Sequence, residues 1–182
     1  MQPLGDMPLI GWTLERCRRW FPEIPVWVAT EDRATIEYAA GFGCHPFPLN
    51  ADDLEDRRCV DGLFAAFLAG WPTDERCLCM QPTSPFLFRS EIERAIAHPG
   101  YYVQSGSCRI FPGPAESRLS QEIPTEEFLT GNFITGYGQG HWLKHGKSVS
   151  PVSAISALEI DTPEDLELCR WLAQNIQPED FD

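Results

Sequence analysis

The sequence predicts an α/β fold, a three-layer sandwich around a mostly parallel, Rossmann-like sheet. Two short apolar runs, residues 26–29 and 77–80, have the composition of strands that are buried on both faces. Segments with helical periodicity precede and separate these runs. A nearly complete helix start, Thr-Pro-Glu-Asp at 162–165, opens the last helix. Strands that alternate with helices in this way are typical of the predicted architecture.

The first predicted elements are a helix, a strand and a second helix. Apolar residues recur at helical spacing before the prolines at 22 and 25: Ile10, Leu14, Cys17 and Phe21. Residues 26–29 follow as a strand. Residues 30–32 (Thr-Glu-Asp) supply a cap and first-turn acids for a helix that continues through Ile36 and Ala39 and closes at 41–43.

The middle of the chain repeats the alternation. The clearest apolar stripe predicts a helix over 60–71, which Pro72 ends. Residues 77–80 form the next buried strand, and residues 81–85 form the loop at its carboxyl end. We expect Ser90 to cap the helix that follows.

The remaining elements are predicted less completely. Strands are expected over 101–105, 131–135 and 154–160, and a final helix starts at Pro163. The stretch of about 112–146 is rich in proline and glycine, so we expect it to be largely irregular and to act as a lid or a dimerisation segment. Its aromatic part, 128–142, is the candidate homodimer surface.

Composition limits the classes of function. The chain has 182 residues, 43% of them hydrophobic, which suits one domain spanning 1–182. Its formal net charge is −13, with only 14 lysine and arginine residues, so a nucleic acid would have to bind against long-range repulsion. A phosphate-bearing ligand would need a divalent cation or a local cluster of donors to overcome the same field. We therefore expect no nucleic-acid partner, and dependence on Mg²⁺.

The chain carries no signal for membrane insertion and no disulfide framework. Its amino-terminal residues lack a basic and an apolar region, and no apolar run approaches the ~20 residues of a membrane span. We expect a cytoplasmic protein without a membrane partner. Its seven cysteines are odd in number and scattered, and the Cys77-x-Cys79 spacing does not suit zinc, so we interpret them as small buried side chains.

In an open α/β sheet, ligands bind outside the carboxyl ends of the strands, so the loops there are the candidate site. Three such segments stand out: 30–32, 81–85 and 159–161. Glu159 and Asp161 are two residues apart, so in an extended segment both face one side and can share a hard cation. The alternative is that Glu159 is solvated and Asp161 only caps the following helix.

Four segments carry a resemblance to a known family. They are residues 7–15 (MPLIGWTLE), 28–32 (VATED), 80–85 (MQPTSP) and 158–166 (LEIDTPEDL). In this order they resemble signature segments of the acylneuraminate cytidylyltransferases, which make CMP-sialic acid and related CMP-sugars from CTP. The match runs from about Pro3 to the last helix and is thin between Cys108 and Pro151.

The resemblance implies a fold of the nucleotide-diphospho-sugar transferase type, with CTP or CMP and an acidic sugar as partners. It implies that Gln81, Thr83 and Ser84 line the nucleotide and sugar pocket, and that Glu159 and Asp161 hold Mg²⁺. Asp161 and Gln81 would be the catalytic residues. The implied reaction is attack by a sugar hydroxyl on the α-phosphorus of CTP, with release of pyrophosphate.

Two of these three loops have an alternative role that is purely structural. Thr30 and Asp32 cap a helix and are also candidate nucleotide ligands. The alternative for residues 81–85 is a proline-framed turn after a strand.

The chain departs from the family pattern near the phosphates. Asp6 and Met7 stand where a Gly-Lys pair is common, and Glu159 stands where the metal pair usually starts with Asp. Leu87 replaces the arginine that usually follows the Ser-Pro turn, and Arg89, two positions on, is the candidate substitute. These changes remove positive charge or alter the metal ligands.

The resemblance further implies that family members begin with a buried strand and a glycine- and lysine-containing loop that wraps the CTP phosphates, and that this chain starts just after that loop. In the family the strand lies between those predicted here at 26–29 and 77–80, so its loss would leave two apolar edges. Three outcomes stay open: those two strands pair directly, another strand fills the place, or the true start lies upstream.

Three functions follow. The first is an enzyme that transfers CMP from CTP to an acidic sugar. The second is a catalytically degenerate family member that acts as a nucleotide-binding or assembly module. The third is a different nucleotidyl- or glycosyltransferase on the same kind of sheet, since a fold does not determine its substrate.

Overall fold

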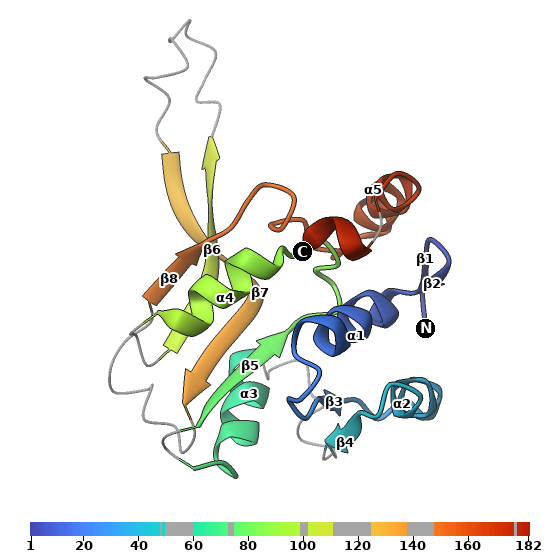
Figure 1. The fold of residues 1–182 in the computed structure, drawn as a ribbon. Helices are drawn as coiled ribbons and strands as arrows, with labels where there is room; N and C mark the ends of the chain where they lie inside the picture. The colour runs from blue at the N-terminus through green and yellow to red at the C-terminus, as the bar shows by residue number, and fades with distance from the viewer. Residues whose placement is uncertain are drawn as a thin grey trace, which may run out of the picture.

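The computed structural model describes residues 1–47, 49, 60–72, 75–98, 102–110, 125–137, 148–176 and 178–182. Expectations for residues 111–124 and 138–147, including most of the candidate lid, lie outside the described residues. Figure 1 shows the chain as a ribbon, with helices on both sides of a central sheet.

The amino-terminal part matches the predicted helix and strand. A short antiparallel pair, β1 (Pro3–Leu4) and β2 (Met7–Pro8), turns at Gly5, whose φ of 61° favours glycine. It leads into α1 (Leu9–Trp20) and then into β3 (Trp27–Ala29). β3 was expected to be buried on both faces, which is wrong, because Trp27 is 40% exposed.

The next unit is a helix and a strand. α2 (Arg33–Ala40) starts at Asp32, whose carboxylate accepts from the Thr35 backbone N–H, so the predicted cap is confirmed. The expected first-turn acids are wrong, because the helix begins after Asp32 and its first turn holds no acidic residue. Gly43, with φ of 73°, turns the chain into β4 (His45–Phe47). β4 pairs in parallel with β3, and these two strands form a small sheet of their own.

Helix and strand alternate again in the middle. α3 (Val60–Leu68) and β5 (Arg76–Met80) lie where the apolar stripe and the second apolar run predict them. α4 (Arg89–Ala97) follows. Ser90 does not cap α4, contrary to the expectation, because Phe88 is the N-cap and Ser90 lies inside the first turn.

The larger sheet has four strands in the order β5-β7-β6-β8. β6 (Tyr102–Ile110) and β7 (Thr125–Tyr137) are longer than predicted, so part of the segment expected to be irregular is a strand. β7 is antiparallel to both β5 and β6, and β8 (Ser148–Pro151) is parallel to β6. Three of the four strands therefore run in the same direction.

The expected strand over 154–160 is wrong. The sheet strand is the earlier β8, and residues 154–157 form turns, because Ser153 and Ser156 hydrogen-bond each other instead of a neighbouring strand. The final helix, α5 (Pro163–Ala173), is confirmed. Thr162 is its N-cap, and Thr162 and Asp165 form a complete capping box.

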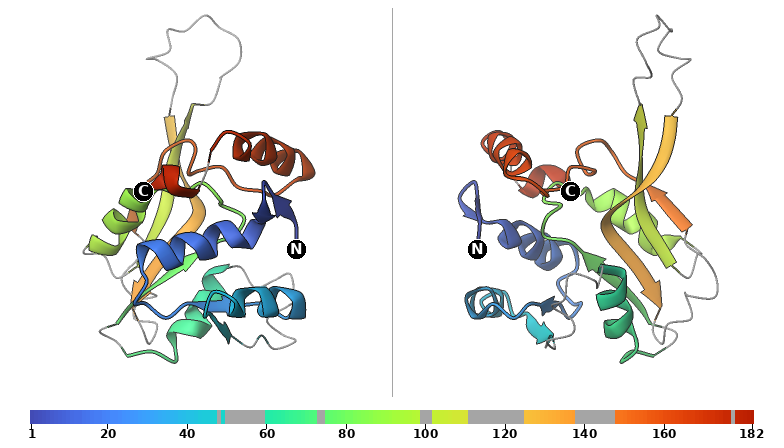
Figure 2. Two further views of the ribbon diagram at one scale, coloured as in Figure 1. Left: turned by 45° about the vertical axis from the view of Figure 1, so that its right-hand side comes forward. Right: turned by 180° about the vertical axis from the view of Figure 1, so that it is seen from behind.

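Helices cover both faces of the four-stranded sheet. Figures 1 and 2 show α4 on one face and α3 on the other, with α1 on the same side as α4. The main cluster of buried side chains includes Trp12, Phe86 and Phe133. Phe133 is fully buried there, and a homodimer surface over 128–142 stays a prediction. Within the described residues, no helix is long and apolar enough to span a membrane.

Candidate functional site

Two of the predicted site segments meet at the end of β5. Residues 81–84 form a turn in which the Ser84 backbone N–H donates to the Gln81 carbonyl oxygen at 3.1 Å. The Ile160 backbone N–H donates to the Thr83 carbonyl oxygen at 2.9 Å, and the Thr83 side chain hydrogen-bonds the Glu159 carboxylate. The loop after β5 and the segment 158–161, which we call the acidic loop, are therefore held together.

The two carboxylates of the acidic loop influence each other. Partial burial raises the pKa of Glu159, the negative charge of Asp161 raises it further, and the hydrogen bond from Thr83 opposes the increase. Asp161 is exposed, and its backbone N–H donates to Asp165 Oδ2 at 3.2 Å. Neighbouring carboxylates fit Mg²⁺, which is commonly bound by one or two of them together with substrate phosphates. The described residues contain no cluster of three or more metal-ligating side chains.

A buried glutamate that the sequence did not single out holds the turn at 153–156, which precedes the acidic loop. Glu91 of α4 is 6% exposed and accepts from the Ser153 backbone N–H at 2.6 Å and from the Ser156 hydroxyl. Ser156 Oγ also contacts the Phe86 carbonyl oxygen at 3.1 Å. The sequence could indicate only that Glu91 lies on the buried face of a helix, because its hydrogen-bond partners are more than 60 positions away.

The residues of the segment 30–32 are engaged in capping. Thr30 Oγ1 accepts from the Asp32 backbone N–H at 3.1 Å. The Asp32 carboxylate accepts from the backbone N–H and hydroxyl of Thr35, and these bonds lower the pKa of Asp32. Thr30 still lines the cavity described below, whereas the structure uses the Asp32 carboxylate for the helix start. A ligand role for both residues stays a prediction.

Arg89 is engaged in an ion pair on its own helix. Its Nε lies 2.7 Å from Glu93 Oε1 in an i,i+4 ion pair on the surface of α4. Leu87 is fully buried, and its carbonyl oxygen accepts from Nη1 of Arg16 at 3.2 Å. Burial lowers the pKa of Arg16 to about 10. Sequence reasoning missed Arg16, although its i+4 spacing from Trp12 places it on the buried side of α1.

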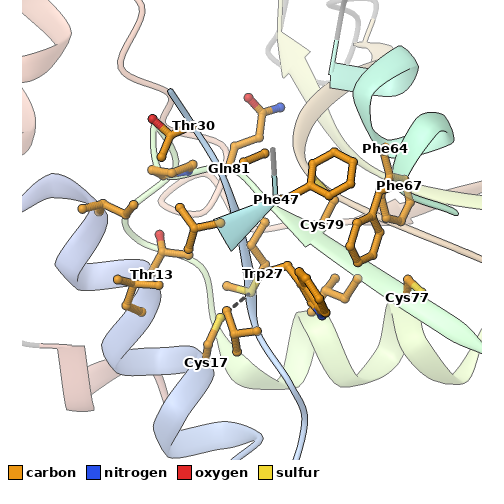
Figure 3. A pocket seen from close by; sticks show the side chains of 18 of the residues that line it. Thr13, Cys17, Trp27, Thr30, Phe47, Phe64, Phe67, Cys77, Cys79 and Gln81 are labelled. Atoms are coloured by element: carbon orange, nitrogen blue, oxygen red, sulfur yellow. Dashed lines mark hydrogen bonds between the residues drawn. The ribbon is translucent and has the colours of Figure 1, made fainter. Parts of the chain in front are cut away.

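A cavity of about 680 Å³ lies beside these loops, between β3 and β5. Thr30 and Gln81 line it, and Figure 3 shows them near each other at one end. The rest of the lining is mainly apolar and comes chiefly from α1, α3, β3 and β5, with Phe47 of β4 among the other residues. Gln81 is thus the predicted site residue that joins the loop after β5 to the cavity, while Ser84 is fully buried beneath the turn.

Comparisons with known proteins support the fold. No protein-family model matches the chain, and no curated protein does. Among solved structures, CMP:2-keto-3-deoxy-manno-octonic acid synthetase complexed with CTP is similar, with a TM-score of 0.69 and 13% identity, over 96% of this chain and 91% of that one.

Two further solved structures are similar to this chain, and the names of both enzymes include an erythritol derivative. The 2-C-methyl-D-erythritol 4-phosphate cytidylyltransferase of Thermus thermophilus has a TM-score of 0.62 and 15% identity, over 94% of this chain and 91% of that one. The 4-diphosphocytidyl-2C-methyl-D-erythritol synthase of Anaerococcus prevotii has a TM-score of 0.65 and 11% identity, over 95% and 88%. The chain has the fold that these cytidylyltransferases share.

Proposed function

We infer that this chain is a cytidylyltransferase of the kind that activates acidic sugars, as its resemblance to acylneuraminate cytidylyltransferases implies. The observation that carries the proposal is the hydrogen-bonded junction of the two loops through Thr83. It brings the polar Gln81 turn beside the carboxylates of Glu159 and Asp161 at the carboxyl end of β5, where ligands of α/β sheets bind.

In this proposal the chain binds a cytidine nucleotide at Gln81, at Thr83 and at the cavity wall beside Thr30, while the fully buried Ser84 holds the turn through its bond to the Gln81 carbonyl oxygen. A hydroxyl of an acidic sugar attacks the α-phosphorus of CTP, the new O–P bond forms, and pyrophosphate leaves. Glu159 and Asp161 would hold Mg²⁺, which when bound supplies charge neutralisation for the phosphates. Gln81 would orient the nucleotide, and the Thr83 hydroxyl would keep Glu159 in place.

A second candidate, a nucleotide-binding module without turnover, is favoured by the charges around the cavity. Among the described residues that line it, the only basic side chain is Arg76, whose guanidinium donates to the carbonyl oxygens of Ile96 and His98. Arg89 is paired with Glu93. The described part of the lining therefore offers little positive charge to a triphosphate.

Calorimetric titration with CTP, and separately with CMP, in Mg²⁺ tests the proposal. We expect micromolar CTP binding that Asp161→Ala abolishes, and pyrophosphate release from CTP with an acidic sugar. The matched control is Glu164→Ala, an exposed acid of the first turn of α5. Binding without turnover over a panel of sugar acids would favour the binding module, and absence of binding to both nucleotides would contradict both candidates.

A further inference from the structure

The segment that connects β8 to α5, drawn in orange in Figure 1, contacts residues 83–86 at two points. At the first point the Ile160 backbone N–H donates to the Thr83 carbonyl oxygen at 2.9 Å. At the second, Ser156 Oγ lies 3.1 Å from the Phe86 carbonyl oxygen. One segment advances between the two points while the other recedes, so the two segments run antiparallel to each other.

A buried carboxylate on α4 secures the second point. Glu91 is 6% exposed, and its Oε1 accepts from the Ser153 backbone N–H at 2.6 Å. Its Oε2 accepts from the Ser156 hydroxyl. Both carboxylate oxygens are therefore engaged by donors of one turn. A carboxamide in this place would offer only one acceptor oxygen, because its nitrogen can only donate.

Backbone hydrogen bonds continue from this turn to the acidic loop. The Ser153 carbonyl oxygen accepts from the Ala157 N–H at 3.0 Å, and the Ile155 carbonyl oxygen accepts from the Leu158 N–H at 3.1 Å. Leu158 directly precedes Glu159. The turn that the buried carboxylate holds therefore leads into the acidic loop without a break in the bonded backbone.

The direction of these bonds matters as well as their number. Burying a carboxylate is costly unless donors satisfy it, so the turn that supplies both donors is restricted to one place against α4. Hydrogen bonds also require a definite geometry, whereas apolar packing does not. Glu91 thus determines where the turn lies and how it is oriented.

The candidate metal ligands depend on this placement. Glu159 and Asp161 can share a cation only if their backbone holds both carboxylates at the required positions. The Thr83 side chain hydrogen-bonds the Glu159 carboxylate, which fixes one of the two side chains. Residues that orient metal ligands in this way affect metal affinity although they do not contact the metal.

We propose that Glu91 is a positioning residue, which fixes the backbone of 153–160 so that Glu159 and Asp161 can bind a divalent cation together. The identity of the ligand rests on the proposed function. Glu91 itself does not contact the cation in this proposal, because its two oxygens are engaged by Ser153 and Ser156.

The first test titrates the full chain and its variants with Mn²⁺, whose binding is followed by electron paramagnetic resonance. Mn²⁺ suits the same oxygen ligands as Mg²⁺. Glu91→Gln removes one acceptor at nearly constant volume, and Ser156→Ala removes one donor without changing the charge. We expect each to raise the Kd for Mn²⁺ about ten-fold or more. The double variant should bind about as weakly as the weaker single variant, since both changes break one network.

The matched control is Glu93→Gln, on the same helix. Glu93 is exposed and pairs with Arg89, so this change removes the same charge without touching the turn. We expect its Kd for Mn²⁺ to stay near that of the wild type. A loss equal to that of Glu91→Gln would overturn the proposal, because net charge alone would then explain it.

The second test measures amide hydrogen exchange by NMR without metal. In Glu91→Gln the Ile160 amide should exchange roughly ten-fold faster, while amides of α1 keep their wild-type rates. An increase of equal size throughout α1 would show a general loss of stability and would overturn a positioning role. So would unchanged Mn²⁺ affinity in Glu91→Gln and Ser156→Ala, or independent, additive losses in the double variant.

The two tests separate this proposal from the proposed function. Absence of Mn²⁺ binding to the wild type would contradict the metal site of the proposed function. The Ile160 amide would then still decide whether Glu91 positions the acidic loop, because its exchange requires neither metal nor nucleotide.

Discussion

The Ile160 backbone N–H donates to the carbonyl oxygen of Thr83 at 2.9 Å, although the two residues are 77 positions apart in the sequence. This bond attaches the acidic loop to the turn that follows β5. Glu91 of α4 holds the turn just before this loop, through Ser153 and Ser156. The candidate site is therefore supported by contacts at both of its ends, and these contacts can be removed separately.

Glu159→Gln should make the chain more stable at high pH. The raised pKa of Glu159 means that the folded chain holds this proton more tightly than the unfolded chain, so the free energy of unfolding falls as pH rises through that pKa. The variant should match the wild type near pH 4 and melt about 1–2 °C higher at pH 8 without metal. Thermal denaturation monitored by circular dichroism measures this. Glu23→Gln, an exposed acid, is the control for net charge.

Glu91→Ala should destabilise the chain by about 1–3 kcal/mol, because the Ser153 N–H and the Ser156 hydroxyl lose a buried acceptor. Glu93→Ala, on the same helix, removes only an exposed ion pair with Arg89 and should cost less than about 1 kcal/mol. Urea denaturation of both variants measures the difference. Equal costs would mean that Glu91 does not hold the turn at 153–156.

Thr162→Ala should lower the free energy of unfolding by about 1 kcal/mol, because α5 loses the hydroxyl that accepts from the Asp165 N–H. We expect Tm to fall by about 2–4 °C in differential scanning calorimetry. Ser90→Ala should leave Tm nearly unchanged, because Ser90 lies within the first turn of α4 and does not cap it. A loss at Ser90 equal to that at Thr162 would show that Ser90 is the cap after all.

Phe133→Ala should cost about 3–5 kcal/mol, because the side chain is fully buried in the main core. Trp171→Ala, a larger truncation at a side chain that is 61% exposed, should change stability by less than about 0.5 kcal/mol. Chemical denaturation of both variants tests whether β7 passes through the core. A small effect at Phe133 would contradict that placement.

Much of the helical structure could be predicted because its signals are local. The stripe of α1, the Asp32 cap of α2 and the capping box of α5 all involve residues within a few positions of each other. The prediction of a strand over 154–160 was wrong because strand formation depends on non-local contacts. Its composition suits a strand, but whether a segment pairs depends on a neighbour far away in sequence, and β6 takes residues 148–151 as its partner instead.

The sequence predicted which loops form the candidate site, but not how their side chains lie relative to one another. Gln81, Thr83 and Glu159 were named from motifs, and the structure brings them together. Arg89 was expected near the phosphates, yet its position on α4 favours the i,i+4 pair with Glu93. Glu91 was not named, because no pattern in sequence connects it to Ser156.

By itself the sequence determined where helices begin, which segments are apolar enough for strands, and which loops carry polar side chains, since these properties depend on neighbouring residues. Only the tertiary structure decided that β7 enters the sheet antiparallel between β5 and β6, that Thr83 joins the acidic loop, and that β3 and β5 lie in separate sheets beside the cavity. The physical reason is that strand pairing and cavity formation depend on contacts between distant segments, whose free energy no local pattern contains.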